Sequence, residues 1–346
     1  MKHQTTRYGE IPFYKIGTFG NTADAFISKE LFLEYKTKYS FPKKGDILIS
    51  ASGTIGRAVI YDGKPAYFQD SNIVWIDNDE TLVKNDFLFY AYSNVKWNTE
   101  HTTILRLYND NFRNTLIPLP PLNEQIAIAN ILSGLDRYLC ALDALILKKE
   151  SVKKALSFEL LSQRKRLKGF NQAWQRVRLG DIANYLTSNL SAEQIAQQGK
   201  IKVYDVNNFI GYTDTTFISD KPYISIVKDG SVGRVRILPP KTNILSTMGA
   251  LIANHRTTTE FLFYLLSNFD FKNFTSGSII PHIYFKDYKE KTIFLPPLNE
   301  QSAIANILSA LDNEIASLKN KKRQFENIKK ALNHDLMSAK IRVLKK

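Results

Sequence analysis

The sequence predicts an α+β protein with an internal pseudo-two-fold repeat, in which each of two variable blocks is followed by a long helix. Two observations carry this prediction. The segments 119–136 and 295–312 begin 176 residues apart (295 − 119) and agree at 16 of 18 positions. The blocks before the two copies share short stretches and differ elsewhere. Solenoid repeats have periods of about 20 to 50 residues, so this is a duplicated module instead.

The composition fits a nucleic-acid-binding protein of two ordinary domains in its 346 residues. Lys and Arg exceed Asp and Glu by 14, which attracts polyanions, although a basic surface could also serve solubility alone. The single cysteine, Cys140, excludes an internal disulfide and suits the cytoplasm, where we expect the protein. The first residues lack the apolar run of a signal peptide, and no stretch approaches the ~20 apolar residues of a membrane span.

The order of the pieces predicts four segments. A first variable block is followed by a first helical region, a second variable block and a second helical region. The predicted boundaries are 1–117, 118–167, 168–294 and 295–346.

Both helices follow a Pro-Pro pair, which is tolerated at a helix start because the missing N–H would be unpaired there. Glu124 and Glu300 fall in the first turn, where a negative charge meets the positive end of the helix dipole. Apolar residues then recur at spacings of three and four over about 46 residues, or ~70 Å of helix. A helix of this length cannot bury its apolar stripe alone, so each stripe must pack against another surface. The other helix carries a matching stripe, although each helix could instead pack on its own domain.

The variable blocks mix strand and turn signals. Two apolar runs flank a glycine-containing turn in 47–61 and again in 223–238. The similar stretches 87–94 and 261–268 predict a short amphipathic helix in each block. Strands combined with short helices indicate that both blocks are α+β domains of one fold.

The ordered double set of motifs resembles the specificity subunit of type I restriction–modification systems over essentially the whole chain. The motifs are the two LPPLNEQ helix starts, the turns SGTIGR at 52–57 and DGSVGR at 229–234, and VRLGDIANYLTS at 177–188. The resemblance implies two target recognition domains, each reading one half of a split DNA sequence. It also implies that the two long helices pair antiparallel as a coiled-coil-like spacer.

The same resemblance implies the partners of the chain. The paired helices would dock two methyltransferase (modification) subunits and, in the full complex, restriction/translocase subunits. Adenine methylation from S-adenosylmethionine and ATP-driven cleavage would belong to those subunits, so the chain itself would be non-catalytic and hold no cofactor. The helix-start residues Glu124, Gln125, Glu300 and Gln301 are assigned to subunit docking.

The first block departs from the pattern at its N-terminal end. Aligning 9–14 with 199–204 places Met1 opposite Ser191, which leaves no counterpart of 174–190. We therefore expect a shortened first domain. Either the start lies upstream, or recombination between the near-identical repeats has produced a shuffled, silent cassette.

Candidate DNA-binding residues come from polar positions in the turns and from positions that correspond between the blocks. Arg and Lys can contact phosphate, and side chains at groove edges can read bases. Arg106 and His282 stand 176 residues apart (282 − 106), as expected of readers tuned to different targets. In the first block the candidates are Ser52, Thr54, Arg57, Gln69, Ser71, Asn72, Arg106 and Tyr108. In the second block they are Lys228, Ser231, Arg234, Arg236, Ser276, Ser278, His282 and Tyr284.

Each candidate also has a structural interpretation: hairpin geometry for the glycines, solvation for the arginines, a capped turn for 69–72 and a packed position for the histidine. No phosphate-binding glycine motif is present, and one Cys with five scattered His does not predict a zinc site. Two alternatives of other classes remain. One is a helical interaction scaffold with nonspecific DNA binding. The other is RNA binding through Gly-x-x-Gly turns as in KH domains, where such turns join helices rather than strands.

Overall fold

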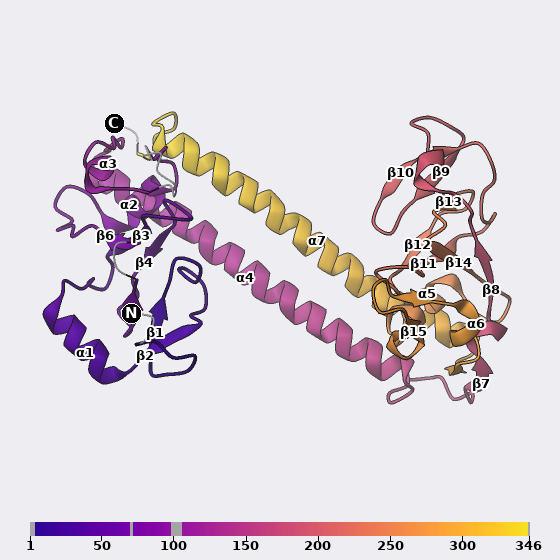
Figure 1. The fold of residues 1–346 in the computed structure, drawn as a ribbon. Coiled ribbons are helices and arrows are strands. Elements are labelled where there is room, and N and C mark those ends of the chain that lie inside the picture. The colour runs from indigo at the N-terminus through magenta and orange to yellow at the C-terminus, as the bar shows by residue number, and fades with distance from the viewer. Residues whose placement is uncertain (1–3, 70–71, 98–105, 345–346) are drawn as a thin grey trace. The chain divides into compact units, whose positions relative to one another are not determined.

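The computed structural model describes residues 4–69, 72–97 and 106–344 (Figure 1). The chain divides into two compact units. Unit 1 comprises Met1–Asp143 with Asn320–Lys346, and unit 2 comprises Ala144–Lys319. Each unit therefore holds one variable block and one half of each long helix. This division cuts across the four predicted segments, whose boundaries stay a prediction.

Unit 1 contains two three-stranded sheets, ordered β2-β1-β5 and β4-β3-β6. In the first sheet β1 pairs antiparallel with β2 and parallel with β5, and in the second sheet both pairs are antiparallel. The elements of its variable block are β1 (Ile11–Tyr14), β2 (Ala25–Ile27), α1 (Lys29–Lys38), β3 (Ile47–Ser50), β4 (Ala58–Ile60), β5 (Tyr67–Phe68), β6 (Ile73–Trp75), α2 (Asn85–Tyr92) and α3 (Asn109–Arg113).

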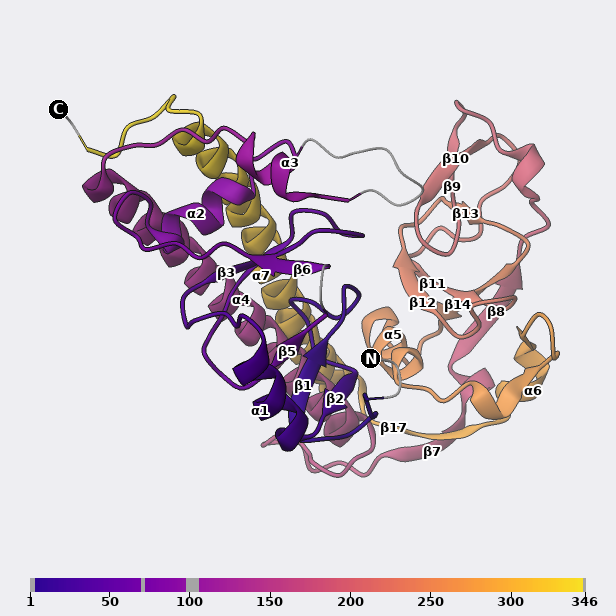
Figure 2. The same cartoon turned by 60° about the vertical axis from the view of Figure 1, so that its left-hand side comes forward.

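Unit 2 repeats this plan and extends it. Its sheets are ordered β10-β9-β13 and β12-β11-β14-β8, with the two-stranded pairs β15-β16 and β17-β7 in addition. The larger sheet lies between the β10-β9-β13 sheet and helix α5 (Figure 2). The elements are β7 (Gln175–Arg178), β8 (Ala183–Thr187), β9 (Ile201–Tyr204), β10 (Phe209–Thr213), β11 (Tyr223–Val227), β12 (Val235–Leu238), β13 (Asn243–Ile244), β14 (Met248–Ala253), α5 (Thr259–Ser267), β15 (Thr275–Ser276), β16 (His282–Ile283), α6 (Phe285–Tyr288) and β17 (Thr292–Leu295).

The predicted α+β class and its internal repeat are confirmed by the matching sheets. The units differ in β7 and β8, which form a continuous segment of unit 2. Strand β8 adds a fourth strand beside β14, and β7 pairs antiparallel with β17. Within the described part of unit 1, β6 corresponds to β14 and pairs with β3 alone, so it has no counterpart of β8 beside it. Residues 116–119 correspond to β17, and no described strand of unit 1 pairs with them.

The core of unit 2 joins its sheet to the long helices. Every residue of β11 is buried, because the sheet is covered on both faces. Leu179 and Ile182, from the segment that links β7 to β8, are fully buried in the same cluster as Leu160 of α4 and Ile304 of α7. Burying such side chains stabilises a fold by about 1.5 to 3 kcal/mol each, so the helices are part of the core of the domain.

The two long helices are shorter than the sequence predicts. Helices α4 (Leu122–Leu161) and α7 (Leu298–Met337) have 40 residues each, rather than about 46. They start directly after the Pro-Pro pairs, because a residue that precedes a proline avoids helical backbone angles. They end two residues before Gln163 (φ 61°) and Ala339 (φ 55°), whose left-handed conformation turns the chain away. None of the described helices has the length and apolar character to cross a membrane.

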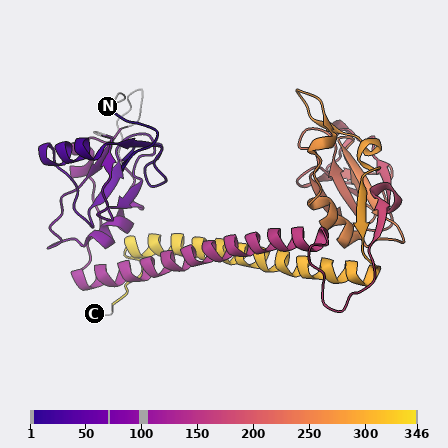
Figure 3. The ribbon, with the colours of Figure 1, turned by 90° about the horizontal axis from the view of Figure 1, so that it is seen from below.

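Within each unit the two half-helices run antiparallel (Figure 3). In unit 1, Asp136 of α4 pairs with Lys329 of α7, and in unit 2, Asp312 of α7 pairs with Lys153 of α4. Each aspartate also accepts a hydrogen bond from the tyrosine of the preceding short helix, Tyr90 at 2.7 Å or Tyr264 at 2.9 Å. Burial and the nearby carboxylate raise the pKa of both tyrosines, so they remain protonated donors. The same triad thus ties each variable block to both helices.

Candidate nucleic-acid interface

In unit 1 three of the predicted DNA-reading residues lie together beside the turn between β3 and β4. Ser52 and Arg106 form an isolated antiparallel bridge, so the segment that begins at Arg106 runs alongside the turn. The hydroxyl of Ser52 donates to Asn72 Oδ1 at 2.7 Å, and Arg106 Nη2 donates to the same oxygen at 3.3 Å. Three segments far apart in the sequence therefore supply a hydroxyl, an amide and a guanidinium at one place.

Unit 2 has the same arrangement with other side chains. The turn residue Asp229 bridges His282 in the backbone, as Ser52 bridges Arg106. The side chains also meet, with His282 Nδ1 2.5 Å from Asp229 Oδ1. The ring of Tyr284 stacks against His282 with a centroid distance of 6.4 Å, and the ammonium of Lys286 lies 5.5 Å from the Tyr284 ring. One backbone frame therefore presents different hydrogen-bonding groups in the two units.

The arginines that follow the turns hold neighbouring loops. Arg57 Nη1 donates to the Phe19 carbonyl at 3.0 Å, in the loop between β1 and β2. Arg234 donates to Asn207 Oδ1 at 2.8 Å and Arg236 to the Asn207 carbonyl at 3.0 Å, in the corresponding loop between β9 and β10. These contacts favour a structural role, because each one fixes a loop that carries none of the candidate readers.

The packing around the second glycine of each turn explains why glycine stands there. Gly56 has φ 82°, and a Cβ placed there would lie 2.4 Å from Trp97 Nε1. Gly233 has φ 79°, and its Cβ would lie 2.6 Å from the ring of Phe271. Both the backbone angle and the close aromatic neighbour exclude a side chain. The structural interpretation of these glycines therefore suffices.

The remaining candidates lie around these two places. Tyr108 and Tyr284 are about half exposed, and Thr54, Ser231, Ser276 and Ser278 are exposed, whereas Ser52 is buried. Ser71 lies outside the described residues. The other positions are Thr54 and Gln69 in unit 1, and Lys228, Ser231, Ser276 and Ser278 in unit 2. Sequence reasoning missed Asp229 and Asn207 as candidates; the correspondence of Asp229 with Ser52 in the two turns was the available signal.

The structure gives the four residues assigned to subunit docking a role within the chain, and their assignment to docking stays a prediction. Glu124, Gln125, Glu300 and Gln301 are all buried and bonded within their own units. The Gln301 amide donates to the carbonyls of Arg256 at 2.9 Å and Pro296 at 2.8 Å. Its oxygen accepts from the Thr257 hydroxyl and the Thr258 amide, and Gln125 makes the corresponding backbone bonds in unit 1. A polar helix start suggests an exposed surface, but here it fixes the helix to its domain.

The Glu124 carboxylate gives unit 1 a pH-dependent stability. Hydrogen bonds and the charge of Arg342 lower the pKa of Glu124 in the folded chain. Its contribution is therefore present above the unfolded value of about 4.3 and is lost as the pH falls through the lower folded pKa. We expect the stability advantage of the chain over an Arg342→Gln variant to shrink between pH 5 and lower pH, measured by urea unfolding at each pH. An advantage that stays constant over this range would contradict the assignment.

Among the described residues, no cluster of three or more His, Cys, Asp or Glu could hold a metal ion. The clusters around Arg106 and His282 consist of hydrogen-bonding groups that are partly exposed, apart from the buried Ser52. Such groups suit recognition of base edges and phosphates.

The chain as a whole, rather than these two clusters, is similar to known proteins. The model of the type I restriction modification DNA specificity domain matches residues 1–150 and 171–327. A putative type I restriction enzyme specificity subunit of Haemophilus influenzae is 65% identical over 137 residues, which are 39% of this chain and 36% of that protein's length. The putative MjaX specificity subunit of Methanocaldococcus jannaschii is 29% identical over 335 residues, which are 86% of this chain and 79% of that protein.

Two solved structures share the fold. The crystal structure of the type I restriction–modification S subunit from M. genitalium matches with a TM-score of 0.63 and 20% identity, over 97% of this chain and 91% of that one. A chain from a structure of the type I restriction–modification system matches with a TM-score of 0.53 and 16% identity, over 85% of this chain and 82% of that one.

Proposed function

Because the chain belongs to the family of type I restriction–modification DNA specificity subunits, we propose that each unit reads one half of a bipartite DNA sequence. The observation that supports this proposal most directly is a backbone bridge that recurs in both units with different side chains. It joins Ser52 to Arg106 in unit 1 and Asp229 to His282 in unit 2. A shared frame with unlike polar groups is what two readers of unlike half-sites require.

The chemistry of the two clusters differs in kind. In unit 1 the Arg106 guanidinium offers donors suited to guanine, and the Asn72 amide has the donor and acceptor that match adenine. In unit 2 the Asp229 carboxylate is an acceptor suited to the cytosine amino group, with His282 beside it. The net charge of +14 supplies the sequence-independent attraction to phosphate. The two half-sites should therefore have different sequences.

The catalytic steps are assigned to partner subunits. Two methyltransferase subunits and, in a full complex, restriction/translocase subunits would bind along the long helices, in the cytoplasm where the DNA lies. Exposed apolar side chains of the helices are better docking candidates than the four buried helix-start residues. They include Ile126, Ile131, Leu147, Val152, Phe158 and Ile328. Where such side chains form a contiguous patch, they mark a protein-binding surface.

The test is a genome-wide map of N6-methyladenine in cells that carry this chain and its methyltransferase, against cells that lack this chain alone. We expect a split motif with two different halves and constant spacing, which disappears in the deletion strain. A methylation map that does not depend on the chain would favour the interaction scaffold instead.

A further inference from the structure

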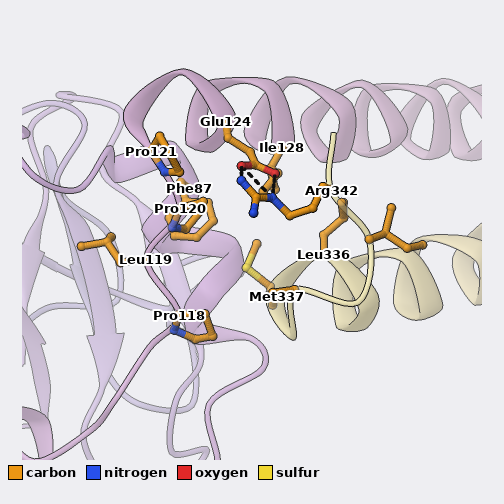
Figure 4. A pocket seen from close by; sticks show the side chains of 12 residues that line it. Phe87, Pro118, Leu119, Pro120, Pro121, Glu124, Ile128, Leu336, Met337 and Arg342 are labelled. Atoms are coloured by element: carbon orange, nitrogen blue, oxygen red, sulfur yellow. Dashed lines mark hydrogen bonds and ion pairs between the residues drawn. The ribbon is translucent and has the colours of Figure 1, made fainter. Parts of the chain in front are cut away.

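The two long helices are nearly identical at their starts and differ soon afterwards. The shared segments 119–136 and 295–312 hold each helix start in its own unit, as the bonds between Glu124 and Arg342 illustrate (Figure 4). Beyond the shared segments, 137–150 of α4 and 313–326 of α7 agree at only 2 of 14 positions. Side chains of these two stretches contact the other helix, so their differences can be compared across the helix pair.

The first difference between the helices is matched by a compatible difference on the partner helix. Positions 138 and 149 of α4 correspond to 314 and 325 of α7 (314 − 138 = 176). In unit 1, Tyr138 packs against Phe325 with a ring centroid distance of 4.7 Å. At the equivalent place in unit 2, Lys149 forms an ion pair with Glu314 at 2.8 Å. One pair is aromatic and the other is charged, and neither pair is mixed.

The charged positions further along the helices are matched in the same way. In unit 1, Lys322 lies between two carboxylates, with ion pairs to Asp143 at 2.7 Å and to Glu326 at 3.5 Å. In unit 2, the position of Asp143 is taken by Lys319, which forms an ion pair with Glu150 at 2.6 Å. The reversal of charge from Asp143 to Lys319 is therefore accommodated by the helix that lies opposite.

Two helices of the same type would lose these matches. With the side chains of α7 on both helices, a lysine at position 143 would face Lys322, and a phenylalanine at position 149 would leave Glu314 without its cation. With the side chains of α4 on both helices, an aspartate at position 319 would face Glu150, and a lysine at position 325 would face Tyr138. Like charges across a helix pair are a common means of rejecting an incorrect partner.

The apolar stripe of the helices cannot distinguish these partners. Its buried members Leu142 and Ile315 correspond to Leu318 and Leu139, so both helices present the same kind of apolar surface there. The ion pairs are about half exposed, and each adds little stability where it forms. The choice of partner therefore depends on the mismatches that a helix of the same type would create.

We propose that residues 138–150 of α4 and 314–326 of α7 are pairing segments, through which each long helix accepts a helix of the other type and rejects a helix of its own type. The rejected partner includes the same helix of a second copy of the chain. This selection goes beyond the reading of DNA, because it determines which helices assemble. Under the proposed function it keeps two unlike readers together, since paired helices of one type would bring together two identical readers.

The test exchanges four matched positions between the helices of the full chain. One variant gives α4 the side chains of α7, through Tyr138→Glu, Asp143→Lys, Ile146→Lys and Lys149→Phe. A second gives α7 the side chains of α4, through Glu314→Tyr, Lys319→Asp, Lys322→Ile and Phe325→Lys. Each variant carries two pairing segments of one type, so we expect its thermal unfolding midpoint, followed by circular dichroism, to fall by about 5 °C or more.

The chain with all eight substitutions is the matched control, because it carries every substitution of the other two variants and has complementary pairing segments again. Its midpoint should lie within about 2 °C of that of the unaltered chain. If a variant with four substitutions is insoluble, recovery of a folded chain by all eight supports the proposal in the same way. An unchanged midpoint in either four-substitution variant, or additive losses in the eight-substitution chain, would overturn it. These outcomes do not depend on methylation, so they are separate from the test of the proposed function.

Discussion

Replacing Asp229 by Ser and His282 by Arg is expected to change one half of the methylated motif and leave the other half intact. The two substitutions install the side chains that unit 1 carries at the corresponding positions, Ser52 and Arg106. Each lost base contact costs about 1 to 3 kcal/mol of discrimination, or roughly a factor of 5 to 150. Methylation at the original sites should therefore fall at least tenfold, as measured by sequencing N6-methyladenine.

The backbone frame should survive this exchange. The bridge between 229 and 282 is made by main-chain groups, and Gly230 N and Ile283 N donate to the carbonyls of Pro281 and Lys228. The side-chain contact between His282 and Asp229 is partly exposed, so its loss costs little stability. A changed motif therefore reports recognition and not unfolding.

The reciprocal exchange provides the control. Ser52→Asp with Arg106→His should alter the opposite half of the same motif. Arg234→Lys should weaken the tether to Asn207 without giving either half a new base preference, because the contact is within the protein. If either exchange altered both halves, or if neither altered the motif, the bridged residues would not be the readers.

The repeat carried most of the fold prediction, because near-identical helix starts and matched strand signals require two copies of one arrangement. Sequence reasoning could also pair Arg106 with His282 and place the turns beside strands. It could not see that Asp229 faces His282, because that contact joins residues 53 positions apart. Tertiary contacts of this kind leave no local pattern in one sequence.

Two features could not be predicted, for physical reasons. The helix ends depend on Gln163 and Ala339 in a left-handed conformation, which glycine or asparagine would have signalled and these residues do not. The sequence does not reveal that Glu300 and Gln301 are buried, because charged and amide side chains are rarely buried. Each is buried here because its polar atoms are bonded, to Arg166 and Trp174 in one case and to four groups in the other.

Gln301→Leu is expected to destabilise unit 2 severely. Leucine has a similar volume but makes none of the four hydrogen bonds of the amide, which are 2.8 to 3.0 Å long. The carbonyls of Arg256 and Pro296 and the amide of Thr258 would then lose a partner at a buried site. Each such group costs about 1 to 3 kcal/mol, so the total loss is at least about 3 kcal/mol. Domains are stable by only about 5 to 15 kcal/mol.

The effect can be assigned to one unit by tryptophan fluorescence. Trp174 reports unit 2 in a chain with Trp75→Phe and Trp97→Phe, and there Gln301→Leu should lower the unfolding midpoint by about 10 °C. Gln125→Leu is the matched variant, because Gln125 bonds to Leu82, Lys84 and Pro120 in unit 1. It should leave the Trp174 midpoint of this background in place, and in the chain with its native tryptophans it should shift the transition that Trp75 and Trp97 report. A Trp174 midpoint that Gln301→Leu leaves unchanged would show that the helix is held to its domain by apolar packing alone.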